Sequence, residues 1–261
     1  LSRELNFFDS KWDKSFYGTY RERVWNGSLG EAEIYSGYGS KLQKENIWIV
    51  NGIKKKEILS FGLAYLTAES LNTKNLVTNI KGNFFYSLDQ KFPISKKEPE
   101  NKSIDTSYSY IQEPISKGFN LNKRLEVSYS FYEDGNHQEY LGIGIGPELI
   151  LGNFKNKTLD YTRLSIFPFY KFDSGESVFK FDQNYDNFTL DFSLDQQIFG
   201  PVILKSLGTF NLTSDSNDYG KLIDSIISLN WRKRSYEFGI FYQPHNHTGG
   251  ISFDLFGFKD L

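Results

Sequence analysis

Apolar residues recur at every second position through much of this 261-residue chain, and this period constrains the fold more than any other feature. The clearest example places Phe188, Leu190, Phe192 and Leu194 against the polar residues between them. Successive side chains of a β-strand point to opposite faces, so such a segment has one apolar and one polar face. The same alternation occurs at 61–65, 80–88, 125–131, 141–145, 227–231, 236–242 and 251–255. The pattern predicts an all-β protein.

Turn-forming residues separate the alternating segments. Short runs rich in Asp, Asn, Ser and Gly occur at 134–136, 173–175, 213–218 and 248–250. Two longer polar stretches, 89–106 and a region around 213–220, are predicted to be loops, and no segment sustains a helical period. At about 20 residues per strand and connection, roughly 12 antiparallel up-and-down strands are expected. We expect a single domain over residues 1–261, with 89–106 as a long polar loop inside it.

A soluble β-sheet domain and a transmembrane β-barrel both alternate, and three features favour the barrel. Aromatic residues such as Tyr65, Tyr86, Tyr236 and Tyr242 are expected near strand ends, as in the aromatic girdles of outer-membrane barrels. The second face is rich in small, polar and charged residues, which suits a wet lumen better than a packed interior. Near the C-terminal end, a glycine followed by spaced hydrophobic residues resembles the last strand of bacterial outer-membrane barrels. The mean hydropathy of -0.48 is compatible with this class, because only every second residue of such a strand must be apolar. The predicted fold is an antiparallel up-and-down transmembrane β-barrel, or the C-terminal part of a larger one.

Composition and motifs argue against most chemistry. The chain has no Cys, which excludes thiolate metal sites and a Cys nucleophile, and its formal net charge of -2 gives no indication of nucleic-acid binding. His245 and His247 could share a strand face as two metal ligands, but a polar hairpin turn explains them better. The glycines at 142, 144 and 146 fit a bending strand or room in a lumen better than a phosphate loop. We therefore expect no enzyme activity, no metal and no cofactor.

Two segments resemble a cyanobacterial outer-membrane barrel family that is itself similar to the lipopolysaccharide-assembly protein of the outer membrane. They read RERVWNGSLG at 21–30 and NWRKRSYEFGIFYQP at 230–244, continuing to GGI at 249–251. The resemblance implies a barrel in the bacterial outer membrane that receives lipopolysaccharide from periplasmic bridge proteins and releases it sideways between its first and last strands. It also implies a barrel-plugging lipoprotein partner and a larger barrel that follows a periplasmic jellyroll. This sequence shows neither the jellyroll nor the plug partner. Because the chain starts at Leu1 without Met, we expect a processed product or a C-terminal portion.

The resemblance places one side of the lateral seam on the last predicted strand. Two adjacent glycines are expected to weaken the start of this strand, and its polar face is thin. The seam residues are Gly249, Gly250, Ile251, Ser252, Phe253, Asp254 and Leu255. The leading hypothesis is translocation or insertion of lipopolysaccharide through this seam. A porin-like diffusion channel and a soluble β-sheet binding domain are the alternatives.

Overall fold

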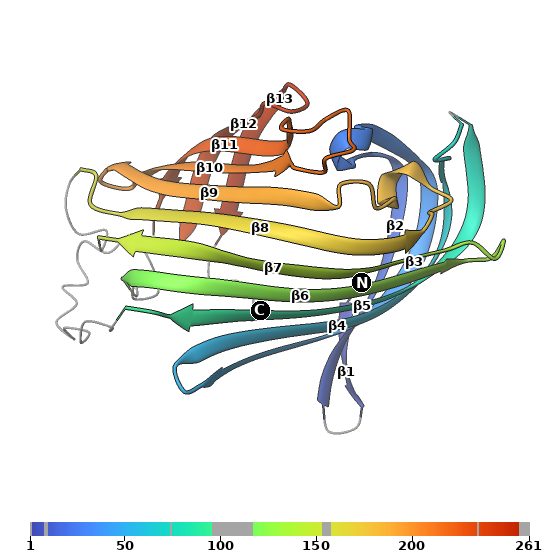
Figure 1. Ribbon diagram of the computed structural model, residues 1–261, viewed down its shortest axis with the longest axis horizontal. Helices are drawn as coiled ribbons and strands as arrows, with labels where there is room; N and C mark the ends of the chain where they lie inside the picture. The colour runs from blue at the N-terminus through green and yellow to red at the C-terminus, as the bar shows by residue number, and fades with distance from the viewer. Residues whose placement is uncertain are drawn as a thin grey trace.

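The computed structural model describes residues 2–7, 10–73, 75–95, 117–152, 158–233 and 235–255. They form one sheet of thirteen strands in which each strand pairs only with its neighbours in sequence, always antiparallel (Figure 1). The strands are β1 (Ser2–Phe7), β2 (Ser10–Trp25), β3 (Glu31–Val50), β4 (Ile53–Glu69), β5 (Leu76–Pro93), β6 (Gly118–Tyr132), β7 (His137–Leu151), β8 (Thr162–Gly175), β9 (Phe188–Phe199), β10 (Val202–Asn211), β11 (Leu222–Arg232), β12 (Tyr236–Gln243) and β13 (Thr248–Leu255). Two short 3₁₀ helices, η1 (Gly27–Leu29) and η2 (Lys180–Asp182), lie in connections. The all-β, antiparallel, up-and-down prediction is confirmed.

Every segment with clean alternation lies in a strand. The predicted loop 89–106, however, starts before β5 ends. Residues 89–93 continue β5 and pair with β6, because their alternating side chains extend the ladder of that hairpin. Residues 94–95 follow the strand, whereas 96–106 lie outside the described residues. The predicted loop around 213–220 connects β10 to β11.

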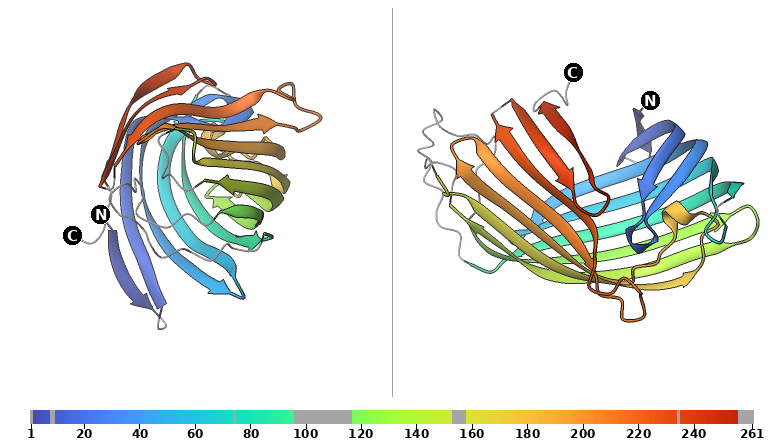
Figure 2. Two further views of the ribbon diagram at one scale, coloured as in Figure 1. Left: turned by 90° about the vertical axis from the view of Figure 1, so that its left-hand side faces the viewer. Right: turned by 90° about the horizontal axis from the view of Figure 1, so that it is seen from above.

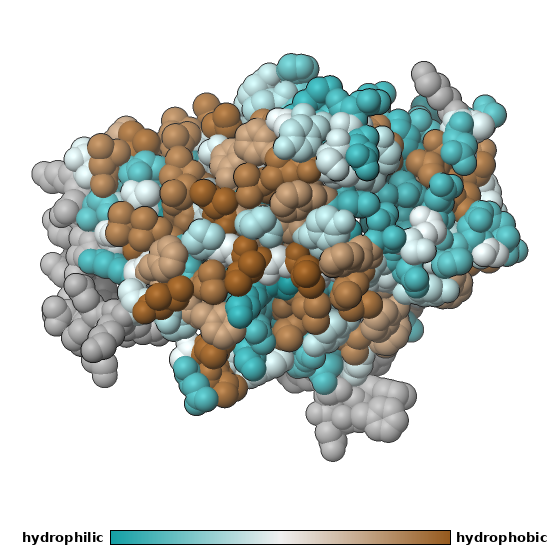
Figure 3. All heavy atoms as spheres, in the orientation of Figure 1, coloured by the Kyte–Doolittle hydropathy of each residue, from teal (hydrophilic) through white to brown (hydrophobic). Residues whose placement is uncertain are grey.

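The sheet is curled into an open trough, so its two faces differ in curvature (Figure 2). The convex face carries large apolar side chains that remain exposed, and cross-strand partners place them in continuous rows. Figure 3 shows these residues spread across the convex face of the middle strands, with hydrophilic residues gathered at one end of the sheet. Exposed members of the rows are Phe61, Leu63, Tyr65, Tyr129, Phe131, Leu141, Ile143, Ile145, Leu164, Ile166, Tyr170, Phe172, Leu229, Trp231, Phe238, Ile240, Tyr242, Ile251, Phe253 and Leu255.

Three of the four expected girdle tyrosines fit their predicted place. Tyr65, Tyr236 and Tyr242 are exposed and lie within a few residues of a strand end. Tyr86 instead lies in the interior of β5, where its hydroxyl donates to Glu57 Oε1 at 3.1 Å. A carboxylate on the neighbouring strand gives this phenol a hydrogen-bond partner within the sheet, so the expectation that Tyr86 lies near a strand end was wrong.

The apolar core lies inside the trough, at one end of the sheet. This end carries the turns that connect β2 to β3, β4 to β5 and β12 to β13, and we call it the capped end. The connection between β8 and β9, residues 176–187, folds onto the concave face there. Its Phe179 is 0% exposed and packs with Tyr132, with ring centroids 6.0 Å apart. The cluster around Phe179 comprises Ile34, Ala64, Leu66, Ala68 and Tyr132, with Val24, Val77, Val178 and Phe181 at its margin. The capped end is therefore filled by the protein's own chain.

Candidate functional site: the concave face and the two sheet edges

The concave face is lined by charged side chains that pair across neighbouring strands. Arg124 Nε lies 2.7 Å from Asp89 Oδ1, joining β6 to β5. Glu148 is 1% exposed and binds Arg163 Nε at 2.7 Å as well as Lys91 Nζ. Because these carboxylates and cations neutralise one another, the face is polar without a strong net charge. Such a face favours contact with water and polar groups over contact with apolar groups.

A second group of ion pairs extends this lining toward the C-terminal strands. Glu237 on β12 forms ion pairs with both Lys205 of β10 and Arg232 of β11. Arg232 Nε lies 3.1 Å from Glu237 Oε2. The Glu237 side chain is almost fully buried, so its two cations satisfy a carboxylate that would otherwise be unfavourable to desolvate. The charged lining therefore extends close to the last strand.

The predicted seam strand is an edge of the sheet. β13 pairs with β12 through all eight of its residues, Ser252 opposite Gly239 and Ile251 opposite Ile240. In the part of the chain that the structure describes, no strand pairs with its other side. Ile251, Phe253 and Leu255 are exposed on the convex side. The ring of Phe241 lies over Gly250, so a side chain at that glycine would come within 3.1 Å of it.

The opposite edge of the sheet is formed by β1 and β2. β1 pairs with residues 10–15 of β2, whereas residues 17–25 of β2 have β3 as their only partner strand among the described residues. Figure 2 shows β13 and the β1–β2 pair on the two rims of the trough. The structure contains no ladder between β1 and β13 within the described segments, so the expected closure into a barrel is not observed there.

The two edges nevertheless meet at the capped end. The indole Nε1 of Trp25, the last residue of β2, donates to the carbonyl of Ile223 in β11 at 2.6 Å. The Trp25 ring also packs against His245, with centroids 4.8 Å apart, and His245 Nδ1 accepts the Ser225 backbone N–H at 2.8 Å. We call Trp25, Ile223, Ser225 and His245 the clasp. It joins β2 to β11 across 198 residues of sequence.

The β2–β3 turn and the β8–β9 connection reinforce the clasp. Asn26 Nδ2 donates to the carbonyls of Lys180 and Gln183 at 2.7 and 3.0 Å. Asp186 accepts from the Ser28 backbone N–H at 2.9 Å and from Asn211 Nδ2 at 2.7 Å. Segments from both halves of the sheet are thus tied together at this end, which sequence reasoning did not predict. The only sequence signal was that Trp25 lies inside one of the two segments that carry the family resemblance.

The two histidines occupy a hairpin turn, as the polar-turn interpretation predicted. His247 has a φ of 58° in the turn between β12 and β13, and its Nδ1 lies 3.1 Å from the Tyr242 hydroxyl. The side chain of His245 is 2% exposed and faces Trp25. The two rings therefore have different partners, and His245 has a packing role that the sequence did not indicate. Among the described residues, no group of three or more His, Cys, Asp or Glu side chains could hold a metal ion.

The glycine series of β7 makes room for aromatic rings on the concave face. A Cβ at Gly142 would lie 2.4 Å from the Phe169 ring, and one at Gly144 would lie 2.5 Å from the Phe167 ring. Larger residues at these positions would displace both rings. The interpretation that these glycines leave room inside the trough agrees with the structure.

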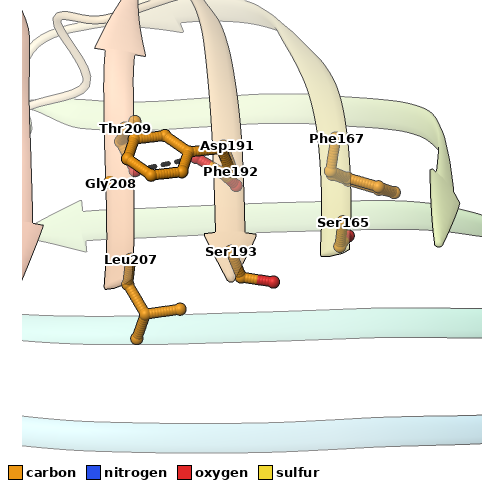
Figure 4. Close-up of a pocket in the computed structure, with 8 residues that line it drawn as sticks. All are labelled: Ser165, Phe167, Asp191, Phe192, Ser193, Leu207, Gly208 and Thr209. Atoms are coloured by element: carbon orange, nitrogen blue, oxygen red, sulfur yellow. Dashed lines mark hydrogen bonds between the residues drawn. The ribbon is translucent and has the colours of Figure 1, made fainter. Parts of the chain in front are cut away.

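A cavity of about 230 Å³ opens on the concave face beside Phe167. Figure 4 shows Phe167 of β8 and Leu207 of β10 on either side of Asp191 and Ser193 of β9. Thr209 Oγ1 donates to Asp191 Oδ1 at 2.8 Å. The remaining lining residues are Ser165, Phe192 and Gly208.

No helix in the described part of the chain is long and apolar enough to cross a membrane. In comparisons with known proteins, the family DUF3769, described as a protein of unknown function, matches residues 1–259. Neither the curated proteins nor the solved structures give a match.

Proposed function

Given that the chain belongs to the DUF3769 family, whose description leaves its activity open, we propose that it is the wall of an outer-membrane β-barrel that passes lipopolysaccharide sideways into the outer leaflet. The observation that carries this proposal is a pair of sheet edges that, within the described residues, form no ladder with each other and are linked by the clasp at the capped end. The lipopolysaccharide cargo itself comes from the family resemblance of residues 21–30 and 230–251.

The distribution of side chains over the two faces supports a membrane location. Ile143 and its row neighbours are exposed on the convex face, whereas Glu148 and Glu237 are buried among cations on the concave face. A water-soluble sheet protein would bury its apolar face against another layer. In a bilayer, the same apolar face is covered by lipid tails and the polar face lines the lumen.

The length and direction of the edge strands support a lateral seam. β13 has eight residues and runs antiparallel to β2, and nine residues of β2, 17–25, have no second partner strand among the described residues. Backbone N–H and C=O groups exposed to lipid need partners, so we expect these two stretches to pair in the resting membrane protein. Each ladder bond contributes only about 0.5–1.5 kcal/mol net, so a short ladder can open. The clasp would keep the strands together at the capped end while the rest of the seam separates.

The alternative of a porin-like diffusion channel is less well supported. An open pore needs a clear lumen, whereas the β8–β9 connection fills the concave face at the capped end around Phe179. A periplasmic bridge and a plugging lipoprotein are expected partners only because the family resemblance implies them.

A disulfide tether across the seam tests the proposal. We would replace Ser252 with Cys together with Thr19→Cys, and in a second variant with Glu22→Cys; the chain has no native cysteine to compete. Under oxidising conditions the tether is expected to block the appearance of lipopolysaccharide at the cell surface, and a reductant should restore it.

The matched control is a tether that does not cross the seam. Ile240 and Ile251 are directly opposite on β12 and β13, so Ile240→Cys with Ile251→Cys joins two strands that are already paired. This control should export normally in both redox states. Normal export by a fully oxidised seam tether would refute the lateral seam and favour the diffusion channel.

A further inference from the structure

One cavity on the concave face combines an apolar wall, a carboxylate and several hydroxyl groups. Two rows of paired residues on three strands build it. Ser165, Ser193 and Leu207 lie opposite one another across β8, β9 and β10, and so do Phe167, Asp191 and Thr209. Cross-strand partners share a face, so all six side chains point into the trough. The side chains of the two serines are small, so they leave the space between Phe167 and Leu207 unfilled, and this space is the 230 Å³ cavity.

Contacts outside the cavity hold the ring of Phe167, its aromatic wall, in place. The Phe167 ring lies over Gly144 of β7, and its centroid is 6.4 Å from that of Phe169 in a stacked arrangement. The Arg124 guanidinium lies 5.3 Å from the Phe167 centroid, at cation–π distance. A ring fixed by these contacts loses little conformational freedom when a ligand packs against it.

The opposite wall is an apolar side chain that the protein covers only in part. Leu207 is 47% exposed although it belongs to the polar concave face rather than to the convex one. The volume of the cavity corresponds to about eight water molecules at ~30 Å³ each, which is room for one small ring. Between the walls, Asp191, Thr209 and the two serines offer hydrogen-bond donors and acceptors.

We propose that this cavity is a binding subsite for one uncharged sugar ring of a saccharide that passes along the concave face. A pyranose presents C–H groups to Phe167 and Leu207 and hydroxyls to Asp191 and the serines. An acyl chain would leave the Asp191 carboxylate without water or a partner for its remaining lone pairs, which is unfavourable. A phosphate group would be repelled by the same carboxylate, because the nearby Arg124 guanidinium is already paired with Asp89. The assignment to the saccharide part of lipopolysaccharide rests on the proposed function; sugar binding itself does not.

Binding of a lipid-free saccharide tests the subsite without any export. The probe is the core oligosaccharide released from lipopolysaccharide by mild acid, titrated into the full chain in detergent micelles and followed by saturation-transfer NMR. We expect Ser193→Phe, which fills the floor, to weaken the apparent Kd at least tenfold. Phe167→Leu should weaken it several-fold, because it keeps an apolar side chain but loses the flat ring, and Phe167→Tyr should retain binding.

The control variant is Ser128→Phe, a half-buried serine on the concave face of β6 outside the cavity. It should bind the probe as the wild type does, which separates filling of the cavity from a general effect of an added ring. Sodium decanoate is titrated in parallel as an acyl-chain probe.

The outcomes distinguish this inference from the proposed function. Wild-type protein that fails to bind the oligosaccharide, or binding that survives Ser193→Phe, overturns the subsite. Binding of decanoate in its place assigns the cavity to acyl chains and also overturns it. The seam tether tests export separately, so loss of sugar binding with an intact tether effect would remove the subsite and leave the lateral seam standing.

Discussion

Ile143 provides a sharp test of whether the convex face meets lipid or water. It lies in the middle of β7, opposite Leu125 and Tyr170, and is 46% exposed. Full burial of an Ile side chain contributes about 1.5–3 kcal/mol to the free energy of unfolding. Ile143 is half-buried, so Ile143→Ala should lower this free energy by about half of that amount. Ile143→Arg removes the same contacts and adds a charge. In water the charge is harmless and the Arg stem recovers some packing, so the two variants should have nearly equal stability.

In a bilayer the two variants are expected to differ strongly. An Arg on the lipid face near the midplane destabilises a barrel by about 2–4 kcal/mol. We expect the free energy of unfolding of Ile143→Arg to be lower than that of Ile143→Ala by about this amount. The measurement is urea titration in phospholipid vesicles, followed by the fluorescence of the four tryptophans. Phe192 is a poorer choice, because its ring stacks with Phe210 at 5.7 Å and its loss would mix packing with charge.

The control for this comparison is Ser128→Arg on the concave face. Its side chain would enter a face already lined with ion pairs and water-accessible groups, so we expect a change within about 0.5 kcal/mol. Equal stabilities of Ile143→Arg and Ile143→Ala in vesicles would refute the reasoning that the convex face contacts lipid. That result would favour a soluble β-sheet domain whose apolar face is covered by another protein layer.

Three further predictions concern the capped end and the concave face. Trp25→Phe keeps the ring contact but removes the hydrogen bond to the Ile223 carbonyl, so urea titration should show a loss of about 1 kcal/mol. Phe179→Ala should lower the free energy of unfolding by about 3–5 kcal/mol, because the loss of a fully buried ring leaves a cavity. If the β8–β9 connection closes the lumen, the same variant should also raise the permeability of cells to large antibiotics. Glu148→Gln leaves two cations, Lys91 and Arg163, without their shared carboxylate. Since both cations are partly exposed, we expect the free energy of unfolding to fall by about 1–2 kcal/mol, and by less in high salt. A decrease that salt does not change would contradict the ion-pair explanation.

Local pattern was sufficient for most of the strand assignments. The period of two identifies strands wherever one face is apolar and the other polar, since pleating alone places alternate side chains on opposite faces. It is least clear in β8, where Phe167 and Phe169 interrupt the polar face. The glycines of β7 that accommodate these rings were visible in the sequence, but the rings they accommodate became known only from the pairing of β7 with β8.

By itself, the sequence determined the strand class, the two-faced character of the strands and the candidate edge strand at 249–255. Only the tertiary structure decided which distant segments meet. Trp25 reaches Ile223 and Phe179 fills the trough because the sheet curls, and curling is a sum of small twists over many strands that no single segment encodes. The cavity beside Phe167 has the same origin, since it requires side chains from three strands in one register. Periodicity reports the direction of each side chain, whereas register and curvature decide which other side chains it meets.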